Sequence, residues 1–80
     1  MDNKDKFIVS VLNSLGLGVN AMIPKNADMF ASRMRQVIND INVGVKEVTD
    51  DKLILVINNS FLLDYRKEGS RVTSVEVRES

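Results

Sequence analysis

The sequence predicts an α+β domain in which two N-terminal helices pack on one face of a C-terminal antiparallel β-meander of three to four strands. Two apolar stripes with helical spacing lie in the first half of the chain. Short β-branched or aromatic runs, separated by turn residues, follow over residues 45–77. Helices followed by strands are typical of the α+β class, so we expect one domain, residues 1–80, with the order α-α-β-β-β-β.

The first helix is predicted over residues 3–15. Its apolar side chains recur at the i, i+3, i+4 and i+7 spacing and form one face: Phe7, Ile8, Val11, Leu12 and Leu15. Gly16 stands where a left-handed residue commonly ends a helix. The β-branched content makes this a poor helix in isolation, so we expect packing to hold it in place.

An apolar connector, residues 17–23, follows the first helix. Gly18 and Asn20 permit turns, whereas the aliphatic side chains between them are too apolar to be left in water. We expect a loop tucked under the core, and the alternative is a loop that presents apolar side chains to a partner. Pro24 then fits just ahead of a helix start.

The second helix is predicted over residues 27–42, with Asn26 as its N-cap and with Asn42 and Gly44 as its end. Its apolar stripe alternates by three and four residues and consists of Ala27, Phe30, Met34, Val37, Ile38 and Ile41. The spacing also resembles a coiled-coil seam. Two heptads are too few for that structure, so we expect the stripe to face the core.

Short strands are predicted over residues 45–49 and 53–57, with a turn at Asp50-Asp51 between them. The second of these runs is continuously apolar. Because a strand that is apolar on both faces needs cover on both, we expect it to be an inner strand of the sheet.

Two further turns divide the rest of the meander. Asn58 and Asn59 tolerate the left-handed conformations that a hairpin turn needs. Gly69 fits a three-residue turn formed by Lys67, Glu68 and Gly69.

Three-residue turns at both hairpins set the register and therefore the two faces of the sheet. The face predicted to receive the helices carries Leu53, Leu55, Ile57, Phe61, Leu63, Tyr65, Thr73, Val75 and Val77. The opposite face then carries an apolar island, which is the predicted partner-binding surface: Ile54, Val56, Leu62 and Val72. Scattered surface aliphatics are the alternative interpretation, and a different register would dissolve the island.

The composition argues against catalysis. The sequence has no histidine and no cysteine, which excludes disulfides and thiolate chemistry and removes the usual catalytic base. The adjacent carboxylates Asp50 and Asp51 are predicted to form a solvated turn. We therefore predict a protein that is not an enzyme, with no catalytic residues, no metal site and no cofactor.

The charges do not favour nucleic acid as a partner, although they do not exclude it. Lys and Arg number 11 and Asp and Glu number 11, so the chain lacks the basic excess of non-specific nucleic-acid binders. The alternative function is nucleic-acid or nucleotide binding through a cationic patch made of Arg33, Arg35, Arg66, Lys67 and Arg71. A helix-turn-helix is not favoured, because the connector between the helices is longer than that motif's turn.

The predicted location is the cytoplasm. No apolar run approaches the roughly 20 residues of a membrane span, and the N-terminus carries charges of both signs. A core of this size supplies little net stability, so self-association is expected as a further source. We predict a small regulatory, inhibitor or adaptor protein that binds another protein and forms a homo-oligomer. Its style resembles the accessory proteins of compact genomes such as those of phages, although no motif carries that resemblance.

Overall fold

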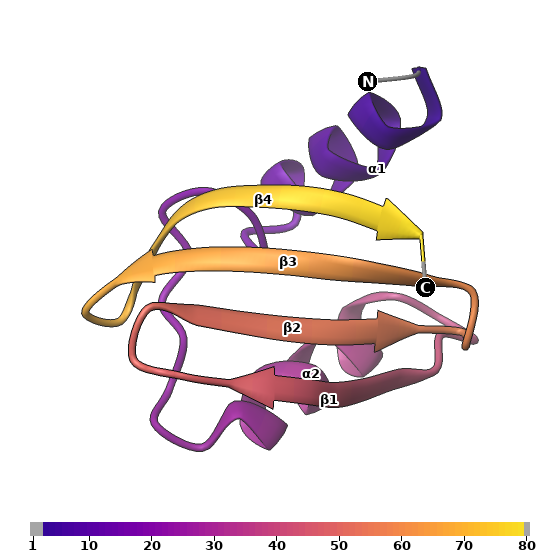
Figure 1. The fold of residues 1–80 in the computed structure, drawn as a ribbon. Helices are drawn as coiled ribbons and strands as arrows, with labels where there is room; N and C mark the ends of the chain where they lie inside the picture. Colours follow the sequence, from indigo (N-terminus) through magenta and orange to yellow (C-terminus); the bar gives the residue numbers. More distant parts are fainter. Residues whose placement is uncertain (1–2, 80) are drawn as a thin grey trace.

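The computed structural model describes residues 3–79 and contains two helices followed by a four-stranded antiparallel sheet (Figure 1). The helices are α1 (Asn3–Ser14) and α2 (Ala27–Val37), and the strands are β1 (Val43–Val48), β2 (Lys52–Ile57), β3 (Phe61–Glu68) and β4 (Arg71–Glu79). Consecutive strands are neighbours, in the order β1-β2-β3-β4. The predicted α+β class and the order α-α-β-β-β-β are confirmed.

The molecule has two layers, because both helices lie on the same face of the sheet (Figure 1). α1 packs beside β4 and α2 packs behind β1, so the helices stand over opposite edges of the sheet. The core between the layers is built from alternate residues of the strands, one stripe of α2, Leu12 of α1 and part of the connector. Its largest fully buried members are Tyr65, Phe30, Leu17, Met34, Leu53, Leu55, Ile57, Leu63 and Val72. The other face of the sheet has no second layer among the described residues.

The β2–β3 hairpin has the predicted register. Leu55 pairs with Leu63 and Ile57 pairs with Phe61, which leaves a three-residue turn between the strands. Asn58 and Asn59 adopt left-handed conformations in that turn, with φ of 53° and 54°. Short polar side chains tolerate this conformation, which explains why the sequence signal was reliable here.

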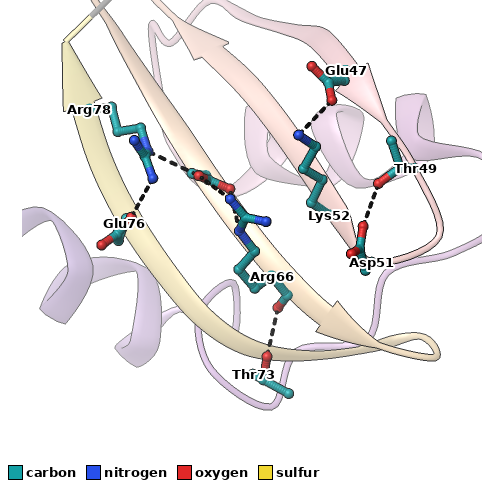
Figure 2. A network of polar contacts seen from close by, with 9 residues as sticks. Glu47, Thr49, Asp51, Lys52, Arg66, Thr73, Glu76 and Arg78 are labelled. Carbon is teal, nitrogen blue, oxygen red and sulfur yellow. Dashed lines mark hydrogen bonds and ion pairs between the residues drawn. The ribbon is translucent and has the colours of Figure 1, made fainter.

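The β3–β4 hairpin differs from the prediction. Glu68 pairs with Arg71, so the turn has two residues, and the register shifts by one residue after Arg66. Thr73 is the extra residue of this β-bulge, and its hydroxyl donates a hydrogen bond to the Arg66 carbonyl oxygen at 3.2 Å (Figure 2). The bulge turns Val72 into the core, where it is fully buried, and leaves Thr73 exposed.

The second helix is shorter than predicted. Asn26 caps it as expected, since its side-chain oxygen accepts a hydrogen bond from the Asp28 amide at 3.0 Å. The helix ends at Val37, because Ile38 is already extended and Asp40 has a φ of 60°. A periodic apolar stripe continues past this end because Ile38 and Ile41 pack on the core from a non-helical segment.

The connector is tucked under the core, and it also covers an edge of the sheet. Its residues Leu17, Ala21 and Ile23 are buried, whereas Val19 and Met22 are exposed. The Ala21 carbonyl oxygen accepts a hydrogen bond from the Val72 amide at 2.9 Å, and Met22 forms a bridge to β4. This pairing satisfies backbone groups at the beginning of β4 that would otherwise lie open at the sheet edge.

Candidate interaction surfaces

The open face of the sheet carries three of the four residues predicted to bind a partner. Ile54, Val56 and Leu62 are half-buried on this face, and Val56 and Leu62 are directly opposite one another on β2 and β3. Val72 does not belong to this surface, because the β4 bulge places it in the core. The apolar island is therefore smaller than predicted.

A shallow hollow adjoins this island at the β1 edge. Gly44 lies opposite Val56 and has no side chain to cover it, and a Cβ atom at Gly44 would lie 3.2 Å from the Val56 Cγ1 atom. The hollow has a volume of about 190 Å³ and is lined by Asn42, Val43, Gly44, Val56 and Asn59.

A buried carboxylate lies beside the island. Asp64 is only 2% exposed, and its Oδ2 atom accepts hydrogen bonds from Arg66 Nη2 at 3.2 Å and from Arg78 Nε at 3.0 Å. Its Oδ1 atom lies 3.2 Å from Arg66 Nε but makes no hydrogen bond with a described residue. Figure 2 shows Arg66 and Arg78 converging from β3 and β4 over the open face.

The register of the strands explains this cluster. Asp64 is directly opposite Glu76 on β4, and Arg66 is directly opposite Lys52 on β2. Like charges placed opposite each other destabilise a sheet. Here Arg78 also donates to Glu76 at 2.8 Å, and Lys52 pairs with Glu47 at 2.8 Å. Each charged side chain of these opposed pairs therefore has a partner of opposite charge.

An apolar groove lies between the two helices on the other side of the sheet. α1 and α2 have no extensive contact with each other, and the space between them has a volume of about 170 Å³. Its walls and floor are apolar throughout: Phe7, Ile8, Val11, Leu12, Met34, Ile38, Ile41, Ile57, Phe61 and Leu63.

Phe7 stands at the rim of this groove. It was predicted to lie on the buried face of the first helix, but it is 69% exposed, the largest exposed fraction of any large apolar side chain in residues 3–79. Leu12 is the one residue of α1 in the fully buried core, and Leu15, just past the end of the helix, is also exposed. The physical reason is that α1 packs mainly on β4 and has no extensive contact with α2.

The predicted cationic patch is dispersed. Arg33 lines an open hollow of about 500 Å³ between α2 and the connector, and Arg35 Nη1 donates to the Val43 carbonyl oxygen at 2.8 Å. Lys67 Nζ donates to the Asp50 carbonyl oxygen at 2.9 Å. The remaining two members lie elsewhere, with Arg66 on the open face beside Asp64 and Arg71 bonded to Asn20 Oδ1 at 3.0 Å.

The structure instead joins Arg66 to Asp64 and Arg78, neither of which was among the predicted site residues. The signal that would have found them is an acidic residue followed two positions later by arginine, at Asp64-Arg66 and again at Glu76-Arg78. On adjacent strands this spacing places all four side chains on one face.

The Asp50-Asp51 turn shows one local interaction. Thr49 Oγ1 donates a hydrogen bond to Asp51 Oδ1 at 2.8 Å, and this bond holds the pKa of Asp51 below its usual value. Within residues 3–79, no group of three or more side chains of the metal-binding types comes together. None of the helices described is long and apolar enough to cross a membrane.

Comparisons of the chain with family models, with curated proteins and with solved structures found no match.

Proposed function

We propose that this chain is a non-enzymatic protein-binding protein that self-associates through the groove between α1 and α2. The observation that carries the proposal is the exposure of Phe7 at the rim of a groove lined by apolar residues. An uncovered apolar surface of this kind is typical of an interaction site. The lack of histidine and cysteine supports a regulatory, inhibitor or adaptor role in the cytoplasm over an enzymatic one.

A second copy of the chain is the occupant that we propose for the groove. None of the described residues that line the groove is charged, so the occupant must present an apolar group without a nearby charge. Phe7 of another copy is such a group, since its own protomer leaves it largely in water. A dry apolar cavity of about 150 Å³ accommodates a benzene ring, so the size of the groove suits a phenyl side chain.

The charges of α1 favour an antiparallel pair of these helices around a twofold axis. The exposed stripe beside Phe7 contains the small residues Ser10 and Ser14, which allow close approach. In such a pair, with the axis at the level of Ile8 and Val9, the first turn of α1, which contains Lys4, would lie at the level of the last turn of the partner's helix. The last turn of α1 has no basic residue, so this lysine would supply the cation that the helix C-terminus lacks.

The expected dimer is weak. The 12 residues of α1 span about 18 Å, so a pair of such helices with one inserted aromatic ring buries less than the roughly 800 Å² per partner of a standard interface. We therefore expect a dissociation constant in the micromolar range or above, so experiments must cover high protein concentrations.

Sedimentation equilibrium of the full chain tests the proposal. We expect the average mass of the wild-type protein to rise towards that of a dimer with concentration, and Phe7→Ser to remain monomeric. Met29→Ser is the matched control, because Met29 is 60% exposed on α2 and does not line the groove. Circular dichroism establishes that each variant is folded. A wild-type protein that is monomeric at every concentration, or a Phe7→Ser variant that associates like wild type, would contradict the proposal.

A further inference from the structure

We infer a second binding site on the opposite side of the molecule, where Arg66 and Arg78 bind a carboxylate presented by a partner protein. In this inference an aliphatic side chain next to that carboxylate packs on the island formed by Ile54, Val56 and Leu62. The site is separate from the groove between the helices, and the inference does not depend on self-association.

Asp64 positions the two arginines. Its carboxylate is 2% exposed and contacts both guanidinium groups, at 3.0 and 3.2 Å. The side chains of Arg66 and Arg78 remain 47% and 52% exposed. One buried anion therefore fixes two half-exposed cations, which reduces the entropy that a ligand must remove on binding.

Both arginines keep N–H groups that are not directed at Asp64 or Glu76. A guanidinium carries five N–H groups. Arg78 uses Nε towards Asp64 and Nη2 towards Glu76, and Arg66 directs Nε and Nη2 at Asp64. The Nη1 groups of both arginines have no partner within residues 3–79. A carboxylate has two oxygens that match such a pair of donors.

The net charge of the cluster favours a ligand with a single negative charge. Arg66 and Arg78 carry two positive charges, and Asp64 and Glu76 carry two negative ones, so the cluster is neutral. Glu76 is 58% exposed and would repel a doubly charged phosphate more strongly than a carboxylate. Two other cations lie nearby, and each has an acidic neighbour: Lys52, opposite Arg66, pairs with Glu47 at 2.8 Å, and Lys4 lines a hollow beside Arg78 together with Asp5.

The apolar island lies next to the two arginines. Leu62 is directly opposite Arg78, and Val56 is directly opposite Leu62 on the next strand. Adjacent strands lie about 4.8 Å apart, so the island begins one strand spacing from the backbone of Arg78. We therefore expect the ligand to carry a branched aliphatic side chain adjacent to its carboxylate, as a C-terminal leucine does.

Titration of the isotopically labelled full chain with N-acetyl-leucine, followed by NMR, tests this inference. We expect saturable shifts at the Arg66 and Arg78 side-chain N–H groups and at the methyl groups of Leu62 and Val56. N-acetyl-leucinamide lacks the carboxylate and N-acetylglycine lacks the aliphatic group, so each should bind at least about tenfold more weakly. Equal binding of the amide, tighter binding of inorganic phosphate, or shifts confined to other surfaces would overturn the inference.

Two substitutions on β4 test whether N-acetyl-leucine binds at Arg78. Arg78→Gln should weaken N-acetyl-leucine binding about tenfold or more, because it removes a charge-assisted hydrogen bond. Arg71→Gln should leave binding unchanged, since Arg71 faces Asn20 at the other end of β4. Phe7→Ser should also leave it unchanged, which separates this result from that of the sedimentation experiment. Loss of binding in Arg71→Gln, or full binding in Arg78→Gln, would contradict the assignment.

Discussion

At the scale of single residues, Tyr65 joins three parts of the molecule. Its hydroxyl donates a hydrogen bond to the Leu17 carbonyl oxygen at 2.6 Å, which links β3 to the connector. Its ring packs edge-to-face against Phe30 of α2, with the ring centroids 5.3 Å apart. Burial of the hydroxyl raises the pKa of Tyr65 far above its usual value of 10.

This burial predicts a loss of stability in alkaline solution. Below pH 10 the tyrosine is neutral in both the folded and the unfolded chain, so its contribution is fully present. Above pH 10 only the unfolded chain ionises, and the free energy of unfolding therefore falls as the pH rises further. Tyr65→Phe should lower stability at pH 7 by about 1–2 kcal/mol, because the Leu17 carbonyl loses its donor. The same substitution should also make the fall in the free energy of unfolding above pH 10 less steep.

Urea unfolding of both proteins from pH 7 to about pH 11 measures the two effects. Tyr65 is the only tyrosine in the sequence, so its ionisation can also be followed directly by ultraviolet absorbance. An equally steep alkaline fall in the Tyr65→Phe variant would show that other groups cause it.

At the scale of elements, local sequence patterns predicted the identity of every helix and strand. The continuous apolar run of β2 and the left-handed asparagines at 58 and 59 depend on the chain within a few residues. The end of α2 and the face of Val72 were predicted incorrectly, because each depends on contacts that local spacing does not encode. Ile38 leaves the helix to pack on the core, and the bulge at Thr73 accompanies a turn one residue shorter than expected.

The junction between α1 and the connector provides a prediction at this scale. Gly18 was predicted to serve as a turn residue, and the structure adds a steric reason for glycine. A Cβ atom there would lie 1.8 Å from Asn13 Oδ1 and 3.0 Å from the Asn13 Cα atom. That oxygen accepts a hydrogen bond from the Val19 amide at 2.9 Å. Gly18→Ala should therefore displace the Asn13 side chain, break this bond and lower the free energy of unfolding by about 1–3 kcal/mol.

A double-mutant cycle with Asn13→Ala isolates the clash. Without the Asn13 side chain, Gly18→Ala should be less destabilising, and the difference is the coupling between the two positions. Additive losses in urea unfolding would mean that the steric contact with this side chain does not explain the glycine.

At the scale of the whole molecule, both candidate surfaces arise from arrangements that the sequence did not reveal. The helical stripes predicted that α1 and α2 cover the sheet, but they did not predict that the helices stand over opposite edges and leave a groove. The cluster around Asp64 depends on the pairing of β3 with β4, including the bulge that sets their register. The part of the candidate site that was predictable, namely Ile54, Val56 and Leu62, followed from the simple alternation of one hairpin.

If α1 mediates self-association, global stability must depend on protein concentration, because association stabilises the folded chain by mass action. The unfolding temperature of the wild-type protein should therefore rise as the concentration increases through the dissociation constant. Phe7→Ser should remove this dependence, whereas Arg78→Gln on the open face should retain it. Differential scanning calorimetry over a hundredfold range of concentration measures the three slopes. A slope in Phe7→Ser equal to that of wild type would place the contact between copies elsewhere, and loss of the slope in Arg78→Gln would assign it to the open face.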